Sequence, residues 1–169
     1  MSFKEIPIAE LSLNPFEKIG KEWFLVTAGD ESGYNTMTAS WGFTGVMWNK
    51  NVFITVIRPN RYTYEFIEKS EYFTASFLPP AQKPALNFCG SHSGRNCDKA
   101  KEAKLTPVFF NGATAFEEAD LIFICKKLYS QDMDISLLPK DLKQFYQADP
   151  MHKQYIGEIT KVLSKSIGN

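Results

Sequence analysis

Two arginines lie three residues apart in the segment Arg58-Pro-Asn-Arg61-Tyr62-Thr63, between an apolar run and a helix-like pattern. Guanidinium groups donate paired hydrogen bonds to phosphate oxygens, and the free N–H groups and dipole of a helix N-terminus also favour an anion. The hydroxyl groups of Tyr62 and Thr63 can add further bonds. The segment therefore predicts a phosphate site; the alternative is a pair of solvated arginines, with Thr63 serving only as a helix cap.

A second candidate segment, Asn35–Trp41, alternates short polar side chains along a predicted strand. Such a strand can bind a flat heterocycle through its main chain and hydroxyl groups, while an aromatic side chain covers the ring. One face would carry Thr36, Thr38 and Ser40, and the other Asn35, Met37, Ala39 and Trp41. The alternative is an ordinary amphipathic strand with a polar outer face.

A third segment, Phe88–Lys99, contains two glycines among short polar residues, which is typical of a loop that brings main chain close to a ligand. Asp98 and Lys99 are expected to begin the next helix. His92 is a possible proton donor, and a solvated loop histidine is its alternative. Cys89 and Cys97 could form a redox pair, but nothing adjacent favours low thiol pKa values, so two independent free thiols are expected.

Patterns of other enzyme classes are missing from the sequence. No GxSxG, GxGxxG or GxxxxGK(S/T) segment occurs, and Glu117 and Glu118 are adjacent, so on a strand they would point to opposite faces. Two histidines and no CxxC pair give no basis for a zinc site. We therefore expect no metal site, and we assign no catalytic acid or base.

The hydrophobic pattern supplies the elements that must position these segments. It predicts a hairpin of residues 23–28 and 34–41, a strand at 51–57 buried on both faces, and a half-buried strand at 71–77 with Phe73, Ala75 and Phe77 on one face. A last strand at 155–163 slips in register at Gly157. The remaining expected strands are 113–116 and 121–130, and the expected helices are 64–69, 84–89, 97–104 and 139–146.

These elements predict a mainly β fold with short helices over one domain, residues 1–169. Strands do not alternate with long helices, so a closed or nearly closed antiparallel barrel with Greek-key-like connections is favoured over a doubly wound parallel sheet. The 14 phenylalanines and 7 tyrosines also favour strands.

Charge and composition narrow the partners and the compartment. Nineteen basic and nineteen acidic residues cancel, so no basic surface for nucleic acid is expected. The N-terminal segment lacks the layout of a signal peptide, and no apolar run approaches the length of a membrane span. Three cysteines are an odd number, which fits reduced thiols. These features predict a cytoplasmic protein without a membrane partner.

The sequence resembles the flavin reductase-like family of FMN-binding split barrels, in particular its flavoredoxin-type branch. Four segments in family order carry the resemblance: NTMTASWGFTGVMW (35–48), RPNRYTYEFIEKSEYFTASF (58–77), CGSHSGRNCDK (89–99) and YIGEI (155–159). They cover the chain from about residue 20 to 163. The resemblance implies a homodimer of split β-barrels with FMN bound near the subunit interface.

The resemblance also implies roles for individual residues. The strand Asn35–Trp41 would line the isoalloxazine and ribityl groups, and the loop from Ser91 to Lys99 would close over the flavin. The phosphate would be received by Arg58, Arg61, Tyr62 and Thr63, and the loop residues nearest the flavin would be Ser93, Gly94 and Arg95.

The expected function is electron transfer through FMN, because the cofactor carries the redox chemistry and the protein supplies binding and orientation. One form is an NAD(P)H-dependent flavin or ferric reductase. A second is a flavoredoxin-like carrier that exchanges electrons with protein partners and has no nicotinamide activity. A third is a binding or structural module without turnover.

Overall fold

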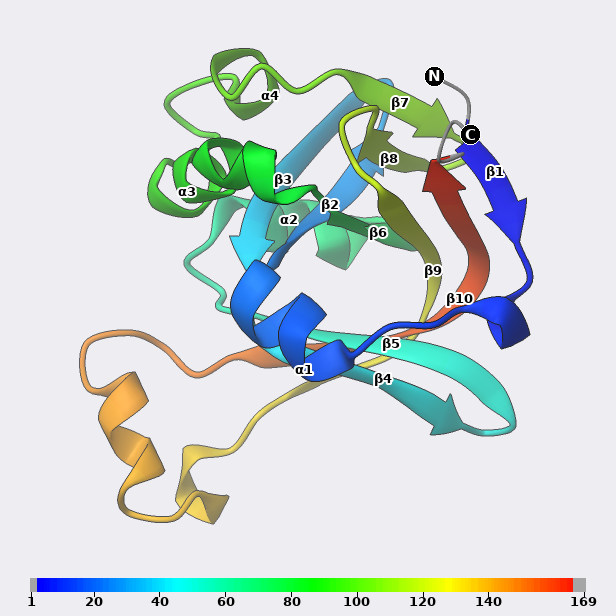
Figure 1. Ribbon diagram of the computed structural model, residues 1–169. Helices are drawn as coiled ribbons and strands as arrows, with labels where there is room; N and C mark the ends of the chain where they lie inside the picture. Colours follow the sequence, from blue (N-terminus) through cyan, green and yellow to red (C-terminus); the bar gives the residue numbers. More distant parts are fainter. Residues whose placement is uncertain (1–2, 166–169) are drawn as a thin grey trace.

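An antiparallel sheet of eight strands forms the body of the protein in the computed structural model, which describes residues 3–165 (Figure 1). The strand order is β3-β2-β6-β9-β10-β5-β4, with β1 beside β10, and β7 and β8 form a separate pair. The strands are β1 (Phe3–Ile6), β2 (Phe24–Asp30), β3 (Gly33–Ala39), β4 (Gly42–Met47), β5 (Lys50–Ile57), β6 (Tyr72–Phe77), β7 (Pro107–Phe110), β8 (Ala113–Phe116), β9 (Leu121–Asp132) and β10 (Lys153–Lys165).

The helices are short and lie between strands. They are α1 (Pro15–Glu17), which continues into the π-helical turn Lys18–Glu22, α2 (Tyr62–Lys69), α3 (Lys83–Ser91) and α4 (Lys99–Glu102). Single 3-10 turns occur at Ile8–Glu10, Pro80–Gln82, Ile135–Leu137 and Leu142–Tyr146. Within residues 3–165, no helix is both long enough and apolar enough to cross a membrane.

The barrel is open along one line. Strands β3 and β4 are the two edges of the sheet and are joined only by the short connection at Ser40–Trp41. The predicted nearly closed antiparallel barrel is therefore present. Its main-chain hydrogen bonding is interrupted between β3 and β4, which do not pair with each other.

Aromatic side chains fill the interior of the barrel. The rings of Phe24, Phe53, Phe77 and Phe123 lie 5.2–6.3 Å apart, mostly edge to face, which is the favoured geometry of aromatic pairs. Phe73, Ala75 and Phe77 share this core, as predicted. The prediction that their strand is half buried was wrong: Thr74 and Ser76 on the other face are also buried, and the Thr74 hydroxyl donates to the Thr114 carbonyl of β8 at 2.6 Å.

The predicted slip at Gly157 is confirmed. The pairing of β10 with β9 shifts register between Ile156 and Gly157. A Cβ atom at Gly157 would lie 2.6 Å from the ring of Phe73 and 2.8 Å from Cβ of Cys125. Only glycine therefore allows the two strands to remain this close to the core.

Two local predictions differ from the structure. Strands β1, β4 and β7 were not predicted, because each contains residues that weaken strand propensity: two charged residues in β1, Gly42 and Gly45 in β4, and Pro107 at the start of β7. The expected cap at Thr63 was wrong, since Arg61 is the N-cap of α2 and no side chain caps the helix. The buried Thr63 hydroxyl instead accepts a hydrogen bond from Nδ2 of Asn35 at 2.7 Å.

An arm of residues 133–152 connects β9 to β10 and projects from the barrel (orange in Figure 1). Arg58, at the end of β5, holds this arm. Its Nη2 donates to the Phe145 carbonyl at 3.0 Å, and its Nη1 lies 3.3 Å from a carboxylate oxygen of Asp149. The ring of Trp41 packs edge-on against Phe145 at 5.6 Å.

His152 ends the arm in a buried position. Its Nδ1 lies 2.9 Å from the hydroxyl of Tyr146, and its ring centroid lies 5.2 Å from that of Trp41. Burial, assisted by the positive charges of Arg58 and Arg61, lowers the pKa of His152 to about 4. The imidazole is therefore neutral at neutral pH and becomes charged only in acid.

Acid should weaken the fold through this histidine. Between pH 6.5 and about 4 the unfolded chain binds a proton at His152 that the folded chain does not, so the free energy of unfolding falls as the pH decreases. The loss should be of the order of 3 kcal/mol. Urea unfolding of the wild type and of His152→Gln, at about pH 7.5 and about pH 4.5, measures it. The variant should lose clearly less stability; an equal loss in both would contradict this origin.

Candidate functional site

Two adjoining cavities lie beside the second half of β3. The strand cavity, of about 190 Å³, lies beside the end of β3, and the helix cavity, of about 130 Å³, lies at the N-terminus of α2. Met37 and Arg61 line both. Residues from the sequence segments 37–41, 56–63 and 89–99, and His152, therefore meet at one place.

The helix cavity concentrates hydrogen-bond donors. The first-turn N–H groups of α2 have no side-chain cap, and the N-terminus of a helix carries a partial positive charge. Arg61 and Lys99 face the same space, together with the hydroxyl-bearing Ser91 and Ser93. No aspartate or glutamate lines the cavity, and within residues 3–165 Arg61 forms no ion pair.

Lys99 is the buried charge of this cavity, with 7% of its surface exposed. Its Nζ donates to the Thr36 carbonyl at 3.0 Å and to the Cys89 carbonyl at 2.8 Å. An ammonium group has three N–H bonds, so one remains for a ligand. Burial, with a smaller contribution of the same sign from Arg61, lowers the pKa of Lys99, and an anion in the cavity would oppose both effects.

The strand cavity is more open than the helix cavity. It is lined by the β3 segment Met37–Trp41, by Val56 of β5, and by Arg58, Arg61 and His152. Trp41 lines the cavity and is 43% exposed, so its ring can cover a planar ligand. The arrangement suits a flat ring in the strand cavity joined to an anionic group in the helix cavity.

The hydroxyl groups predicted to face a ligand are mostly engaged by the protein. Thr38 donates to the Leu86 carbonyl at 2.6 Å, and the Thr36 hydroxyl lies 2.8 Å from that of Thr27. Among the described residues, the Ser40 hydroxyl has no hydrogen bond. The main chain and Ser40, rather than a row of threonines, are thus available to a ligand.

The structure separates the two arginines of the predicted phosphate trap. Arg61 lines both cavities, whereas Arg58 lines only the strand cavity and its guanidinium binds the arm. Tyr62 and Thr63 line the helix cavity, although the Thr63 hydroxyl already accepts from Asn35. Arg61 is consequently the stronger phosphate candidate.

The predicted closing loop reaches the cavities only in part. Ser93 lines the helix cavity, but Gly94 lies in a neighbouring groove with Asn35 and Thr36. A Cβ atom at Gly94 would lie 2.0 Å from Oδ1 of Asn35, so the loop needs glycine there. Arg95 lies away from both cavities: it forms an ion pair with Glu65, and its guanidinium carbon lies 4.8 Å from the ring centroid of Tyr62.

Two kinds of site residue escaped the sequence reasoning. His152 follows an irregular arm, and no spacing connects it to Arg58 or Arg61. Ser91 was placed in the loop, but its exposure to the helix cavity depends on where α3 ends. Cys89 and Cys97 are free thiols, as expected, and burial raises the pKa of Cys89 to about 11, which makes it a poor nucleophile at neutral pH.

Known structures share this fold. The FMN-binding protein of Thermus thermophilus is 21% identical, with a TM-score of 0.69, and the match covers 97% of this chain and 83% of that one. The flavoredoxin of Desulfovibrio vulgaris is 23% identical, with a TM-score of 0.69 and coverage of 96% and 78%. The NADH:FAD oxidoreductase SgcE6 of Streptomyces globisporus is 16% identical, with a TM-score of 0.65 and coverage of 85% and 75%.

At these identities the neighbours establish the fold, which is the mainly β split barrel of flavin reductase structures. No curated protein matches the sequence significantly. The family described as "Flavin reductase like domain" matches residues 16–167, which is nearly the whole chain and includes every residue that lines the two cavities. The chain belongs to the flavin reductase-like domain family.

Proposed function

We propose that the protein holds one FMN, with the phosphate in the helix cavity and the flavin ring in the strand cavity. The observation that carries the proposal is the meeting of Arg61, Lys99 and the uncapped N-terminus of α2 in a cavity without a carboxylate. A phosphate dianion supplies the missing counter-charge. FMN would contribute reversible uptake of hydride and electrons.

Each part of the cofactor has a set of donors in this arrangement. Arg61, the third N–H of Lys99, and the hydroxyls of Ser91 and Ser93 would bind the phosphate, together with the first N–H groups of α2. The main chain of Met37–Trp41 would bind the polar edge of the ring, and Trp41 would cover one side. Neutral His152 adds a donor or acceptor without adding charge.

We propose further that the protein is an NAD(P)H-dependent reductase that passes electrons to free flavin or to ferric iron. The family assignment supports this activity, and so does the shared fold of an NADH:FAD oxidoreductase. The open mouth beside Trp41 would admit a nicotinamide. Three free thiols fit a cytoplasmic setting.

A carrier function is the second candidate, because a flavoredoxin shares the fold with a TM-score of 0.69, against 0.65 for the NADH:FAD oxidoreductase. In that case a protein donor would replace the nicotinamide. The cavities described above serve either function, since both need a bound flavin.

We also propose that two copies associate through the exposed edge strand β4. Phe43, Val46 and Trp48 are 55%, 73% and 58% exposed, and an apolar edge strand open to water favours association. Strand β4 begins directly after Trp41, so a second copy that covers β4 would lie close to the strand cavity.

Replacing Arg61 should weaken FMN binding specifically. Arg61→Ala removes a charge-assisted bond to the phosphate, which should cost about 1.5–3 kcal/mol of binding free energy. Fluorescence titration of apoprotein with FMN measures the change. Arg95→Ala is the matched control, because Arg95 lies outside both cavities and its loss should leave the affinity nearly unchanged. Equal affinities for wild type and Arg61→Ala would remove Arg61 from the site.

Anaerobic reduction separates the two proposed activities. Under the reductase proposal, NADH or NADPH should bleach the visible absorption band of the flavin in the FMN-loaded protein, at a rate at least as high as the turnover rate. Absence of bleaching by both, together with rapid reduction by a low-potential protein donor, would replace the reductase by the carrier. Protein that binds no FMN would contradict both.

Charge placed on β4 should break the association. Val46→Asp introduces a carboxylate at the most exposed apolar position of the strand, where burial against a partner would be unfavourable. Sedimentation velocity should show a dimer for the wild type and a monomer for Val46→Asp. The control Leu137→Asp places the same charge at an apolar position of the arm that is 81% exposed and lies outside β4, so it should remain dimeric. A monomeric wild type would end the proposal.

A further inference from the structure

A buried amide connects the groups that make the helix cavity attractive to an anion. Asn35, on β3, is 6% exposed, and it lines neither the helix cavity nor the strand cavity. In the proposed complex its side chain would therefore act on FMN only through a neighbouring residue. The hydrogen bonds of the amide identify that residue as Thr63, in the first turn of α2.

Two acceptors lie at Nδ2 of Asn35. This nitrogen donates to the Thr63 hydroxyl oxygen at 2.7 Å and to the Thr36 carbonyl at 3.4 Å. A carbonyl oxygen can only accept, so the nitrogen of the amide, and not Oδ1, must face this pair. The same Thr36 carbonyl accepts from Nζ of Lys99 at 3.0 Å. One amide thus links the start of α2 to the carbonyl that holds Lys99.

The hydroxyl proton of Thr63 remains available to a ligand. A hydroxyl group has one O–H bond to donate, and the bond from Asn35 uses only its oxygen, as an acceptor. Within residues 3–165 the Thr63 hydroxyl donates to no group, although Thr63 is 1% exposed and lines the helix cavity. A buried donor without an acceptor is unfavourable. An anionic oxygen in the helix cavity would supply that acceptor.

Position 35 requires a neutral donor for this arrangement. An amide donates to the Thr63 oxygen and leaves the hydroxyl proton for the cavity, whereas a carboxylate of the same shape can only accept and would take that proton. A carboxylate would also bring negative charge next to a cavity that no aspartate or glutamate lines. Asparagine therefore sets the direction of the hydrogen bond as well as its presence.

The loop after α3 keeps the amide in this orientation. Oδ1 of Asn35 lies so close to Gly94 that a Cβ atom at Gly94 would overlap it. The main chain of Gly94 thus packs against the oxygen of the amide, while the nitrogen holds Thr63. Rotation of the amide away from Thr63 would displace this loop.

We propose that Asn35 is a positioning residue for the phosphate of FMN. Its amide occupies the acceptor side of the Thr63 hydroxyl, so the Thr63 O–H is directed to the phosphate in the helix cavity. This role rests on the proposed function, since it requires the phosphate to lie there. Its signature is an effect confined to the phosphate: riboflavin, which has the same ring and ribityl chain but no phosphate, should bind independently of Asn35.

Titration of apoprotein with FMN and with riboflavin, followed by flavin fluorescence, tests the role. Asn35→Ala and Thr63→Val should each weaken FMN by about tenfold, and Asn35→Asp should weaken it further because it takes the hydroxyl proton and adds a charge. Riboflavin affinity should stay within about twofold in all three. The double variant Asn35→Ala/Thr63→Val should bind FMN within about twofold of Thr63→Val alone, because both changes remove one interaction.

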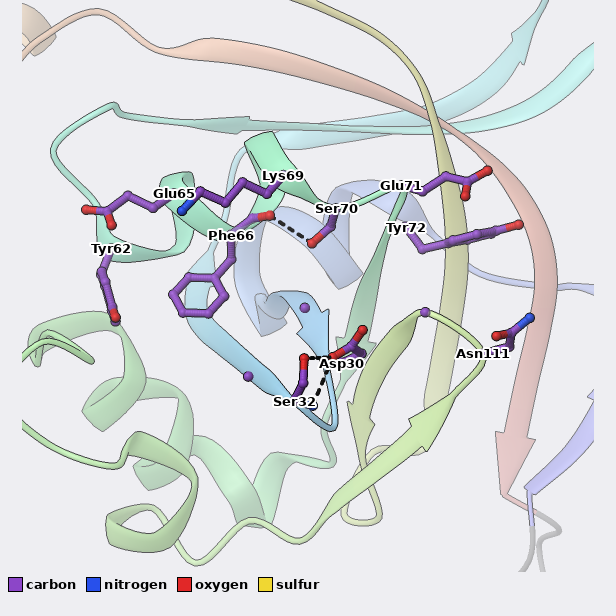
Figure 2. Close-up of a pocket in the computed structure, with 13 residues that line it drawn as sticks. Asp30, Ser32, Tyr62, Glu65, Phe66, Lys69, Ser70, Glu71, Tyr72 and Asn111 are labelled. Carbon is purple, nitrogen blue, oxygen red and sulfur yellow. Dashed lines mark hydrogen bonds between the residues drawn. The ribbon is translucent and has the colours of Figure 1, made fainter.

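Ser70→Ala is the matched control on the same helix. The Ser70 hydroxyl lies at the C-terminal end of α2 and donates to the Phe66 carbonyl at 2.8 Å, a bond drawn as a dashed line in Figure 2. Ser70 lines a separate cavity of about 580 Å³ and not the helix cavity. Its replacement removes a hydroxyl hydrogen bond from α2 without touching the phosphate position, so both flavins should bind as in the wild type.

Equal losses of FMN and riboflavin affinity in the Asn35 variants would reveal a merely structural role and would overturn the assignment. Unchanged FMN affinity in Asn35→Asp, or losses that add in the double variant, would overturn it as well. A wild type that binds no FMN, or that binds riboflavin as tightly as FMN, would instead contradict the proposed phosphate position itself. Riboflavin binding at wild-type affinity also shows that a variant is folded.

Discussion

The buried ammonium group of Lys99 is the constraint around which the candidate site is arranged. Removing such a charge from water costs several kcal/mol unless hydrogen bonds replace its hydration, and two main-chain carbonyls, from β3 and α3, supply only part of that replacement. Strand β3, helix α3 and the start of α2 must therefore converge on one point. The unused N–H bond and the uncapped helix are the groups that the proposed phosphate would contact there.

The opening of the barrel places a flat cavity next to this charge. In a fully paired barrel, β3 would not be an edge strand. The main-chain N–H and C=O groups of Met37–Trp41 would then be hydrogen-bonded to a neighbouring strand. Because β3 and β4 remain unpaired with each other, main-chain groups and Ser40 face a cavity instead. The protein thus combines a rigid paired wall with a strand edge that can bind a ligand.

Much of the fold was accessible from the sequence because its signals are local. Alternation fixed the inner face of Phe73, Ala75 and Phe77, and Gly157 marked the register shift. The three segments of the candidate site were also identified, and most of their residues meet in the two cavities. Side-chain partners were not accessible: Arg58 binds the arm, Arg95 pairs with Glu65, and His152 arrives from an irregular segment. Such choices depend on neighbours distant in sequence.

The arm that Arg58 holds, residues 133–152, is a connection whose length is independent of the barrel. It leaves β9 at Asp132 and returns at Lys153, which are directly paired partners in the sheet, so its length places no demand on the barrel. Arg58 contacts only the last part of the arm, through the carbonyls of Phe145 and Pro150, the carboxylate of Asp149 and the ring of Tyr146. The segment before Phe145 could therefore differ in length and sequence while the barrel and the residues that line the two cavities stay the same.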